Sequence, residues 1–309
     1  MNKNSKIFVA GSSGMVGSSI YNKLIREKYK NILTPSSKKL NLLNQKKVEL
    51  FFKENKPEYV FMCAGKVGGI FANITYPADF IYKNTQMILN VIHYSYIYKV
   101  KKLLFFGSSC IYPKNLKNKI TEDQILTAPM EDTNLSYAIA KIVGLQMCNA
   151  YNSQFNTKFI SLMPSNLYGP NDKYDLKNSH VIPSLIMKFH NAKIKNLKEV
   201  IVFGSGKARR EFLYVEDLAD ASLFLMKKFN KNININVGSG YDISIAELSM
   251  LIKKIIKFKG KIIFDKSKPE GQLKKLMDVT KINKLGWKFK TDLNSGILQA
   301  YNSYKNLYF

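Results

Sequence analysis

The run Lys6-Ile7-Phe8-Val9-Ala10-Gly11-Ser12-Ser13-Gly14-Met15-Val16-Gly17 decides the fold of this chain. Its first five residues predict a short buried strand, its glycines predict a tight turn, and Val16, Ile20 and Leu24 begin an amphipathic helix. This order suits a dinucleotide, because glycines let the backbone approach a pyrophosphate and the helix N-terminus offers N–H groups. The spacing is G-x-x-G-x-x-G rather than the common G-x-G-x-x-G, so an ordinary glycine loop remains the competing interpretation.

Strand-like and helix-like segments alternate through the first half of the sequence. Such alternation indicates parallel β-α-β units with right-handed crossovers, and therefore an α/β fold with a Rossmann-type, doubly wound parallel sheet. The expected strands are Lys6–Ala10, Ile32–Thr34, Tyr59–Cys63, Lys102–Phe106 and Phe159–Met163, and the expected helices lie near residues 14–28, 46–55, 76–98, 134–155, 181–192 and 245–257.

One of these helices carries Tyr137 and, four residues later, Lys141. Residues at i and i+4 share a helix face, so the phenol and the ammonium are expected to enter one site together. A cation within about 4–6 Å lowers a tyrosine pKa by roughly 1–3 units, which suits proton exchange between an alcohol and a ketone. Taken alone, such spacing is more often found on a solvated helix face.

A second motif, Gly107-Ser108-Ser109-Cys110-Ile111-Tyr112-Pro113, directly follows the apolar run Leu103–Phe106. Ligands of parallel sheets bind beyond the carboxyl ends of the strands, so Ser108 and Cys110 are expected to face a substrate. Hydroxyls that merely cap the strand end are the alternative, and the choice depends on whether Tyr137 and Lys141 lie nearby.

Composition and charge limit the classes of protein to which this chain can belong. The 309 residues include three cysteines without metal-ligand spacing and no apolar run of about 18 residues, so we expect a cytoplasmic protein without a membrane span or a metal. The formal charge of +26 suggests nucleic acid, but the lysines are scattered in pairs rather than gathered in one run. We therefore expect the positive field to attract anionic small molecules.

Together these motifs resemble the extended short-chain dehydrogenase/reductase family, and within it the GDP-L-fucose synthase branch, whose members epimerise and reduce GDP-4-keto-6-deoxymannose. The similarity runs nearly from end to end. It rests on Lys66–Ile70, Thr75–Tyr82, Gly107–Pro113, Tyr137–Lys141, Met163–Pro170, Asn178–Pro183, Arg210–Leu213 and Leu285–Trp287.

The resemblance implies an NADP-binding Rossmann domain over residues 1–165, to which a segment near 210–230 returns. It implies a smaller C-terminal α/β substrate domain, discontinuous and covering most of 166–309. It also implies a homodimer that binds a GDP-linked 4-keto-6-deoxy sugar, with neither a nucleic acid nor a membrane as partner.

The same resemblance assigns catalytic roles. Tyr137 protonates the C4 oxygen during reduction, Lys141 lowers the pKa of Tyr137 and binds the nicotinamide ribose, and Ser108 polarises the carbonyl. Epimerisation at C3 and C5 needs a base and an acid on opposite faces, and Cys110 and His180 match that pair. Related 4,6-dehydratases have an Asp-Glu pair where this chain has Ser109 and Cys110, so dehydration is not expected.

NADPH is the expected cofactor. The segment Thr34–Lys39 lacks the acid that binds the ribose of NAD, and it offers groups for a 2′-phosphate. Against this, Ser12-Ser13 stands where the family commonly has a basic pair, so the phosphate contact is either weaker or rests on Lys38. The implied cofactor residues are Gly11, Ser12, Ser13, Gly14, Met15, Val16, Gly17, Ser36, Ser37, Lys38, Ala64, Tyr137, Lys141, Pro164, Asn166, Leu167 and His180.

The substrate half departs from the family pattern. Phe203 stands where relatives can carry tryptophan, and Pro269–Lys274 replaces a family pattern nearer Pro-Asp-Gly-Thr-Pro-Arg. A GDP-4-keto-6-deoxyheptose reductase without epimerisation is therefore the alternative, and a non-catalytic nucleotide-binding or nucleic-acid-binding protein is a remote one. The implied substrate residues are Val67, Gly68, Ser109, Cys110, Asn166, Lys188, Phe203, Arg210 and Lys274.

Overall fold

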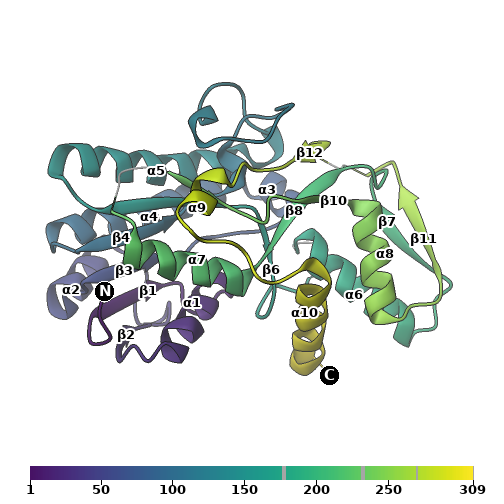
Figure 1. Ribbon diagram of the computed structural model, residues 1–309, viewed down its shortest axis with the longest axis horizontal. Coiled ribbons are helices and arrows are strands. Elements are labelled where there is room, and N and C mark those ends of the chain that lie inside the picture. Colours follow the sequence, from purple (N-terminus) through teal and green to yellow (C-terminus); the bar gives the residue numbers. More distant parts are fainter. Residues whose placement is uncertain (176–178, 231–233, 269–270, 309) are drawn as a thin grey trace.

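A parallel sheet of six strands forms the larger of two lobes, with the strand order β2-β1-β3-β4-β5-β9. The computed structural model describes residues 1–175, 179–230, 234–268 and 271–308 (Figure 1). The predicted doubly wound α/β fold is confirmed. The strands are β1 (Lys6–Ala10), β2 (Asn31–Leu33), β3 (Tyr59–Met62), β4 (Lys102–Phe106), β5 (Phe159–Pro164) and β9 (Ile235–Val237).

Apolar side chains on each strand point alternately to the two faces of the sheet, and helices cover both faces. On β1, Phe8 and Ala10 belong to one core, whereas Ile7 and Val9 belong to the other. Buried parallel strands appear in sequence as short continuous apolar runs, and β1, β3, β4 and β5 were predicted from such runs. The first core is covered by α2 (Gln45–Asn55), α4 (Pro77–Ile97) and α5 (Leu135–Phe155), and the second by α1 (Met15–Arg26) and α7 (Val215–Lys228).

A smaller lobe lies at the carboxyl end of the sheet and has its own core (Figure 1). Its central strand β8 pairs with β6, β10 and β12, and β7 pairs separately with β11. Its elements are β6 (Asn166–Tyr168), α6 (Val181–Ile194), β7 (Glu199–Phe203), β8 (Arg209–Tyr214), β10 (Asp242–Ser244), α8 (Ile245–Ile256), β11 (Lys261–Asp265), β12 (Lys274–Lys275) and α10 (Leu293–Tyr308).

The chain passes between the lobes more than once. After β8 it returns through α7, which packs against α1, and then adds β9 beside β5. Sequence reasoning placed the return near 210–230 and missed β9, because three residues are too few for a recognisable pattern. A later return brings α9 (Thr280–Lys284), with the buried Ile282 and Trp287, onto the sheet lobe.

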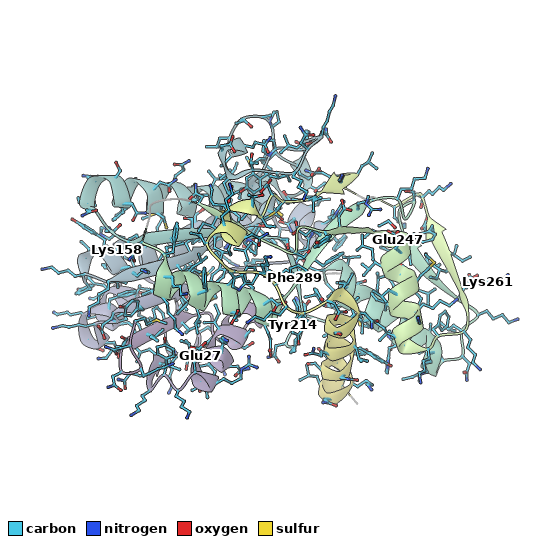
Figure 2. The ribbon with its side chains drawn as sticks, viewed as in Figure 1. Glu27, Lys158, Tyr214, Glu247, Lys261 and Phe289 are labelled. Atoms are coloured by element: carbon cyan, nitrogen blue, oxygen red, sulfur yellow. The ribbon has the colours of Figure 1, made fainter. Side chains whose placement is uncertain are left out.

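Short elements complete the structure. Figure 2 shows Tyr214 and Phe289 between the lobes, with Glu27 in the larger lobe and Glu247 and Lys261 in the smaller one. Among the described residues, we find no helix whose length and apolar character would let it cross a membrane.

The short helices are α3 (Ile70–Thr75) and the 3-10 turns η1 (Ser109–Ile111), η2 (Glu122–Gln124) and η3 (Asp132–Asn134).

Candidate active site

The glycine loop lies at the carboxyl end of β1 and leads directly into α1. Gly11 has a φ of +81°, and a Cβ there would lie 2.7 Å from the backbone nitrogen of Ala64. A Cβ on Gly17 would lie 2.1 Å from the Gly11 carbonyl oxygen, so both positions require glycine. Gly14 is the N-cap of α1 and the first turn is uncharged, which leaves N–H groups for an anion. The loop therefore fits the pyrophosphate of a dinucleotide.

The turn after β2 stands beside this loop, because β2 is the parallel neighbour of β1. Ser36, Ser37 and Lys38 are exposed there, and the amide of Lys39 donates to the Ser36 carbonyl at 3.0 Å. Two hydroxyls and one ammonium can hold a ribose phosphate at this edge, and this role stays a prediction.

Ser108, Tyr137 and Lys141 come together at the carboxyl end of β4. Ser108 caps η1, and its Oγ accepts a hydrogen bond from the Cys110 amide at 3.1 Å. Tyr137, in the first turn of α5, hydrogen-bonds to Ser108. One turn further along α5, the Lys141 Nζ lies 5.7 Å from the centre of the Tyr137 ring. The motif after β4 and the motif on α5 therefore share one site.

Burial dominates the electrostatics of this site. Burial lowers the pKa of the Lys141 ammonium to about 8, and its Nζ donates to the Phe106 carbonyl at 2.7 Å. Burial also raises the pKa of Tyr137, the nearby Cys110 raises it further, and the hydrogen bond to Ser108 opposes the increase. The prediction of a lowered Tyr137 pKa is therefore wrong for this structure. The Lys141 ammonium donates its hydrogen bond to the Phe106 carbonyl, and burial of the phenol is the main cause of the raised pKa of Tyr137.

Cys110 lies in η1, beside Tyr137 and beside a residue that sequence reasoning missed. That residue is Lys275, which hydrogen-bonds to Cys110 from β12. Burial lowers the pKa of Lys275, and its hydrogen bond to Cys110 and the nearby carboxylate of Glu131 oppose that change. The sequence signal was the pair Lys274-Lys275, but only the register of β12 shows which of the two faces the thiol.

His180 stands at the N-cap of α6, and its side chain is exposed. The His180 carbonyl oxygen accepts a hydrogen bond from the Ser184 amide. Asn178, which belongs to the motif that suggested the role of His180, lies outside the described residues. The pairing of His180 with Cys110 across a sugar stays a prediction.

Three residues assigned to the cofactor also have structural contacts where β5 ends and β6 begins. Pro164 pairs with Val237 of β9, and the Asn166 side-chain amide donates to the Glu211 carbonyl at 2.8 Å. Leu167 packs against the core of the sheet lobe. A role in joining the two lobes therefore competes with a role in cofactor binding at these positions.

Two residues assigned to the substrate meet on the smaller lobe. The Lys188 Nζ lies 4.1 Å from the centre of the Phe203 ring and donates to the Ile201 carbonyl at 3.0 Å. Burial lowers the pKa of Lys188, while Phe203 is 53% exposed. An exposed aromatic ring backed by a cation offers a stacking surface for a planar base.

The other residues assigned to the substrate are more dispersed. Arg210 lies on β8 directly opposite Lys275 of β12, which places two cations side by side. Lys274 is exposed beside it. Val67 is exposed, its neighbour Gly68 is partly buried, and Ser109 is buried.

Comparisons with known proteins agree with this geometry. Residues 7–238 match the model of the NAD dependent epimerase/dehydratase family. The chain is 49% identical to GDP-L-fucose synthase 1 of Arabidopsis thaliana, over 98% of this chain and 94% of that protein. These matches cover both lobes.

Two solved structures from Campylobacter jejuni are also similar. A GDP-6-OMe-4-keto-L-xylo-heptose reductase superposes with a TM-score of 0.95 at 38% identity, covering 99% of each chain. A GDP-mannoheptose C4 reductase with NADP bound gives a TM-score of 0.91 at 40% identity, again over 99% of each chain. The chain therefore belongs to the NAD dependent epimerase/dehydratase family, in the GDP-L-fucose synthase branch of the extended short-chain dehydrogenases/reductases.

Proposed function

We propose that this chain is an NADPH-dependent C4-keto reductase of a GDP-linked 4-keto-6-deoxy sugar that also epimerises C3 and C5. The observation that carries the proposal is the meeting of Ser108, Tyr137 and Lys141 with Cys110 at the end of β4. A hydroxyl pair for a carbonyl oxygen, with a thiol beside it, suits chemistry at a ketone and at the carbons next to it.

The residues around the glycine loop fit NADPH. Gly11, Gly14 and Gly17 would hold its pyrophosphate at the start of α1, and Ser36 to Lys38 would hold the 2′-phosphate. When bound, NADPH supplies the hydride for reduction. Lys141 would bind the nicotinamide ribose from the buried floor of the site.

Proton transfer during reduction falls to Tyr137. Its raised pKa keeps the phenol protonated at neutral pH, so it can donate to the C4 oxygen as negative charge develops there. Ser108 hydrogen-bonds the same oxygen and lowers the energy of that charge. The hydrogen bond between Ser108 and Tyr137 places both hydroxyls at one point.

Epimerisation uses the acidity of protons next to the C4 ketone. Cys110 would remove a proton from C3 or C5, and His180 would return one on the opposite face. The same Ser108 and Tyr137 hydroxyls would stabilise the enolate oxygen formed between these steps. The sugar would lie between η1 and the start of α6, with Arg210 on its diphosphate and Phe203 on its base.

A GDP-4-keto-6-deoxyheptose reductase is the second candidate. Its support is the similarity to two heptose reductases. Incubation with NADPH and each GDP-4-keto sugar, followed by NMR of the products, separates the candidates. We expect turnover of the deoxymannose compound with inversion at C3 and C5. Turnover of the heptose alone, with C3 and C5 unchanged, would favour the second candidate.

We propose that residues 1–165 with about 210–230 form the NADP-binding domain, that most of 166–309 forms the substrate domain, and that the protein works in the cytoplasm. The return of α7 to the sheet supports this division. The free cysteines suit a reducing compartment.

We further propose a homodimer that joins α4 and α5 to the same helices of a second copy. Tyr82 and Leu89 on α4, and Ile139 and Phe155 on α5, expose 65%, 37%, 37% and 39% of their surfaces. A Leu89→Lys/Ile139→Lys double variant should sediment as a monomer. An unchanged mass for this variant would rule out that interface.

A further inference from the structure

A cavity of about 580 Å³ opens at the end of the sheet opposite the candidate active site. Its wall includes Tyr59 and Lys102, which begin β3 and β4, and Lys158, which directly precedes β5. Because β4 has five residues, at about 3.3 Å each, roughly 16 Å of strand separates Lys102 from the turn that carries Ser108. Figure 2 shows Lys158 at the end of the larger lobe that faces away from the smaller one. The cavity shares no residue with those assigned to cofactor or substrate.

Positive charge gathers around this cavity. Among the described residues, the lysines that line it are Lys99, Lys101, Lys102, Lys158 and Lys227. Lys101 forms an ion pair with Glu58. Lys227 forms an ion pair with Glu27. The other three ammonium groups have no carboxylate partner within the part of the chain that the structure describes. The wall therefore carries positive charge that the protein itself does not neutralise.

Lys102 is the most enclosed of the three unpaired cations. It is 5% exposed, and its Nζ donates to the Met226 carbonyl at 2.9 Å and to the Phe229 carbonyl at 2.7 Å. An ammonium has three donors, so one N–H is left without an acceptor among the described residues. Burial lowers the pKa of Lys102, and the nearby charge of Lys158 lowers it further. A buried charge without a counter-ion is unfavourable, so a bound anion would stabilise this end of the sheet.

Hydrogen bonds hold the turns that carry the two exposed cations, Lys99 and Lys158. Lys99 has a φ of +56°, and its amide donates to the Tyr96 carbonyl at 3.0 Å. The buried Asn152 side chain accepts from the Phe159 amide at 2.8 Å and donates to the Phe159 carbonyl at 2.7 Å, which fixes the residue after Lys158. The backbone around the cavity is therefore ordered before any ligand binds, and this lowers the entropy lost on binding.

We propose that this cavity binds a diphosphate group, either free or carried by a nucleotide, through the ammonium groups of Lys99, Lys102 and Lys158. Lysines bind phosphates as point charges, and three unpaired cations suit an anion that carries more than one negative charge. The side-chain amides of Asn156 and Asn230 also line the cavity and can donate to phosphate oxygens. Its volume lies within the roughly 300–1,000 Å³ typical of small-molecule sites. Binding here requires neither NADPH nor a sugar.

The first test measures how fast limiting acetic anhydride acetylates each lysine of the full chain, followed by mass spectrometry of the peptides. Saturating NADP⁺ fills the glycine loop, and reading each lysine separately distinguishes this cavity from an anion bound at Arg210. Inorganic pyrophosphate at about ten times its Kd should slow acetylation of Lys99 and Lys158 about tenfold, since the free fraction falls to about a tenth. The exposed Lys259 and Lys284 should be acetylated at an unchanged rate.

The second test compares two double variants that each remove two exposed positive charges. Isothermal titration calorimetry with pyrophosphate and saturating NADP⁺ should show that Lys99→Gln/Lys158→Gln loses, or weakens by at least about tenfold, a binding event that Lys259→Gln/Lys284→Gln retains. Circular dichroism checks that both variants are folded.

GDP distinguishes the two sources of the diphosphate. Stronger protection of Lys99 and Lys158 by GDP than by pyrophosphate would assign the cavity to a nucleotide, and protection by pyrophosphate alone would assign it to the free anion. Sulfate at the same ionic strength should protect much less. Equal protection by sulfate, equal protection of Lys259 and Lys284, or the same calorimetric loss in both double variants would overturn the proposal, because each indicates general screening of a basic surface.

Discussion

The reducing half and the epimerising half of the site are built in different ways. Ser108, Tyr137 and Lys141 come from the end of β4 and the start of α5, which pack together inside the sheet lobe. Cys110 contacts Lys275 from the far end of the chain, and its proposed partner His180 begins a helix of the smaller lobe. Reduction therefore depends on neighbouring elements of one lobe, whereas epimerisation depends on how the two lobes pack against each other. We expect changes in the smaller lobe to disturb epimerisation first.

The largest effect that separates the halves is expected from Tyr137→Phe. Loss of the proton donor should reduce NADPH turnover by at least about 10²-fold, the usual contribution of a general acid. Deuterium exchange into recovered ketone should fall less, because Cys110 and His180 remain. Stopped-flow absorbance and NMR of the recovered sugar measure the two effects. Near-wild-type turnover in the folded variant would remove Tyr137 from the mechanism.

A smaller effect confined to the reducing half is expected from Lys38→Glu. Only NADPH carries the 2′-phosphate, so the KM for NADPH should rise about tenfold while that for NADH changes little, as the loss of one charge-assisted hydrogen bond implies. Steady-state kinetics with both cofactors, alongside an exposed-lysine control such as Lys284→Met, decide this. Equal changes for both cofactors would place the phosphate contact elsewhere.

A third effect, on stability rather than on kinetics, concerns the strand β4 that leads to Ser108. Lys102 begins β4, donates to the Met226 and Phe229 carbonyls, and has its pKa lowered by burial from 10.5 to about 8. The unfolded chain therefore binds this proton more tightly than the folded chain between those two pH values. The free energy of unfolding should rise by no more than about 3 kcal/mol across that window.

Lys102→Met should lack this increase. Urea unfolding of both proteins near pH 8 and near pH 10 measures the difference, and parallel pH dependence in the two proteins would contradict the buried ammonium.

The sheet and the reducing residues were predictable from sequence for a physical reason. Buried parallel strands such as Lys102–Phe106 appear as apolar runs, and the i, i+4 spacing places Tyr137 and Lys141 on one helix face. Both signals are local. The expectation that Ser108 and Tyr137 share one site came from the family resemblance, and the structure brings them together.

The parts that sequence reasoning missed depend on long-range pairing. β9 has only three residues and is recognisable as a strand only through its pairing with β5. Lys275 could not be distinguished from Lys274, because the choice depends on the hydrogen bonds that Arg209 and Ile120 make to that segment. The sign of the Tyr137 pKa shift was also missed, because spacing predicts a nearby cation but not the burial of the phenol.

One measurement tests the central claim, that a single site both epimerises and reduces. The wild-type enzyme is given its best GDP-4-keto sugar and unlabelled NADPH in D₂O, and the product is examined by NMR. We predict deuterium at both C3 and C5 with stoichiometric NADPH consumption. Cys110→Ser should lose that label while still consuming NADPH, and His180→Asn should trap partly exchanged or singly inverted sugar. Reduction by the wild-type enzyme with no enzyme-dependent deuterium at either carbon would contradict the account and leave a C4 reductase alone.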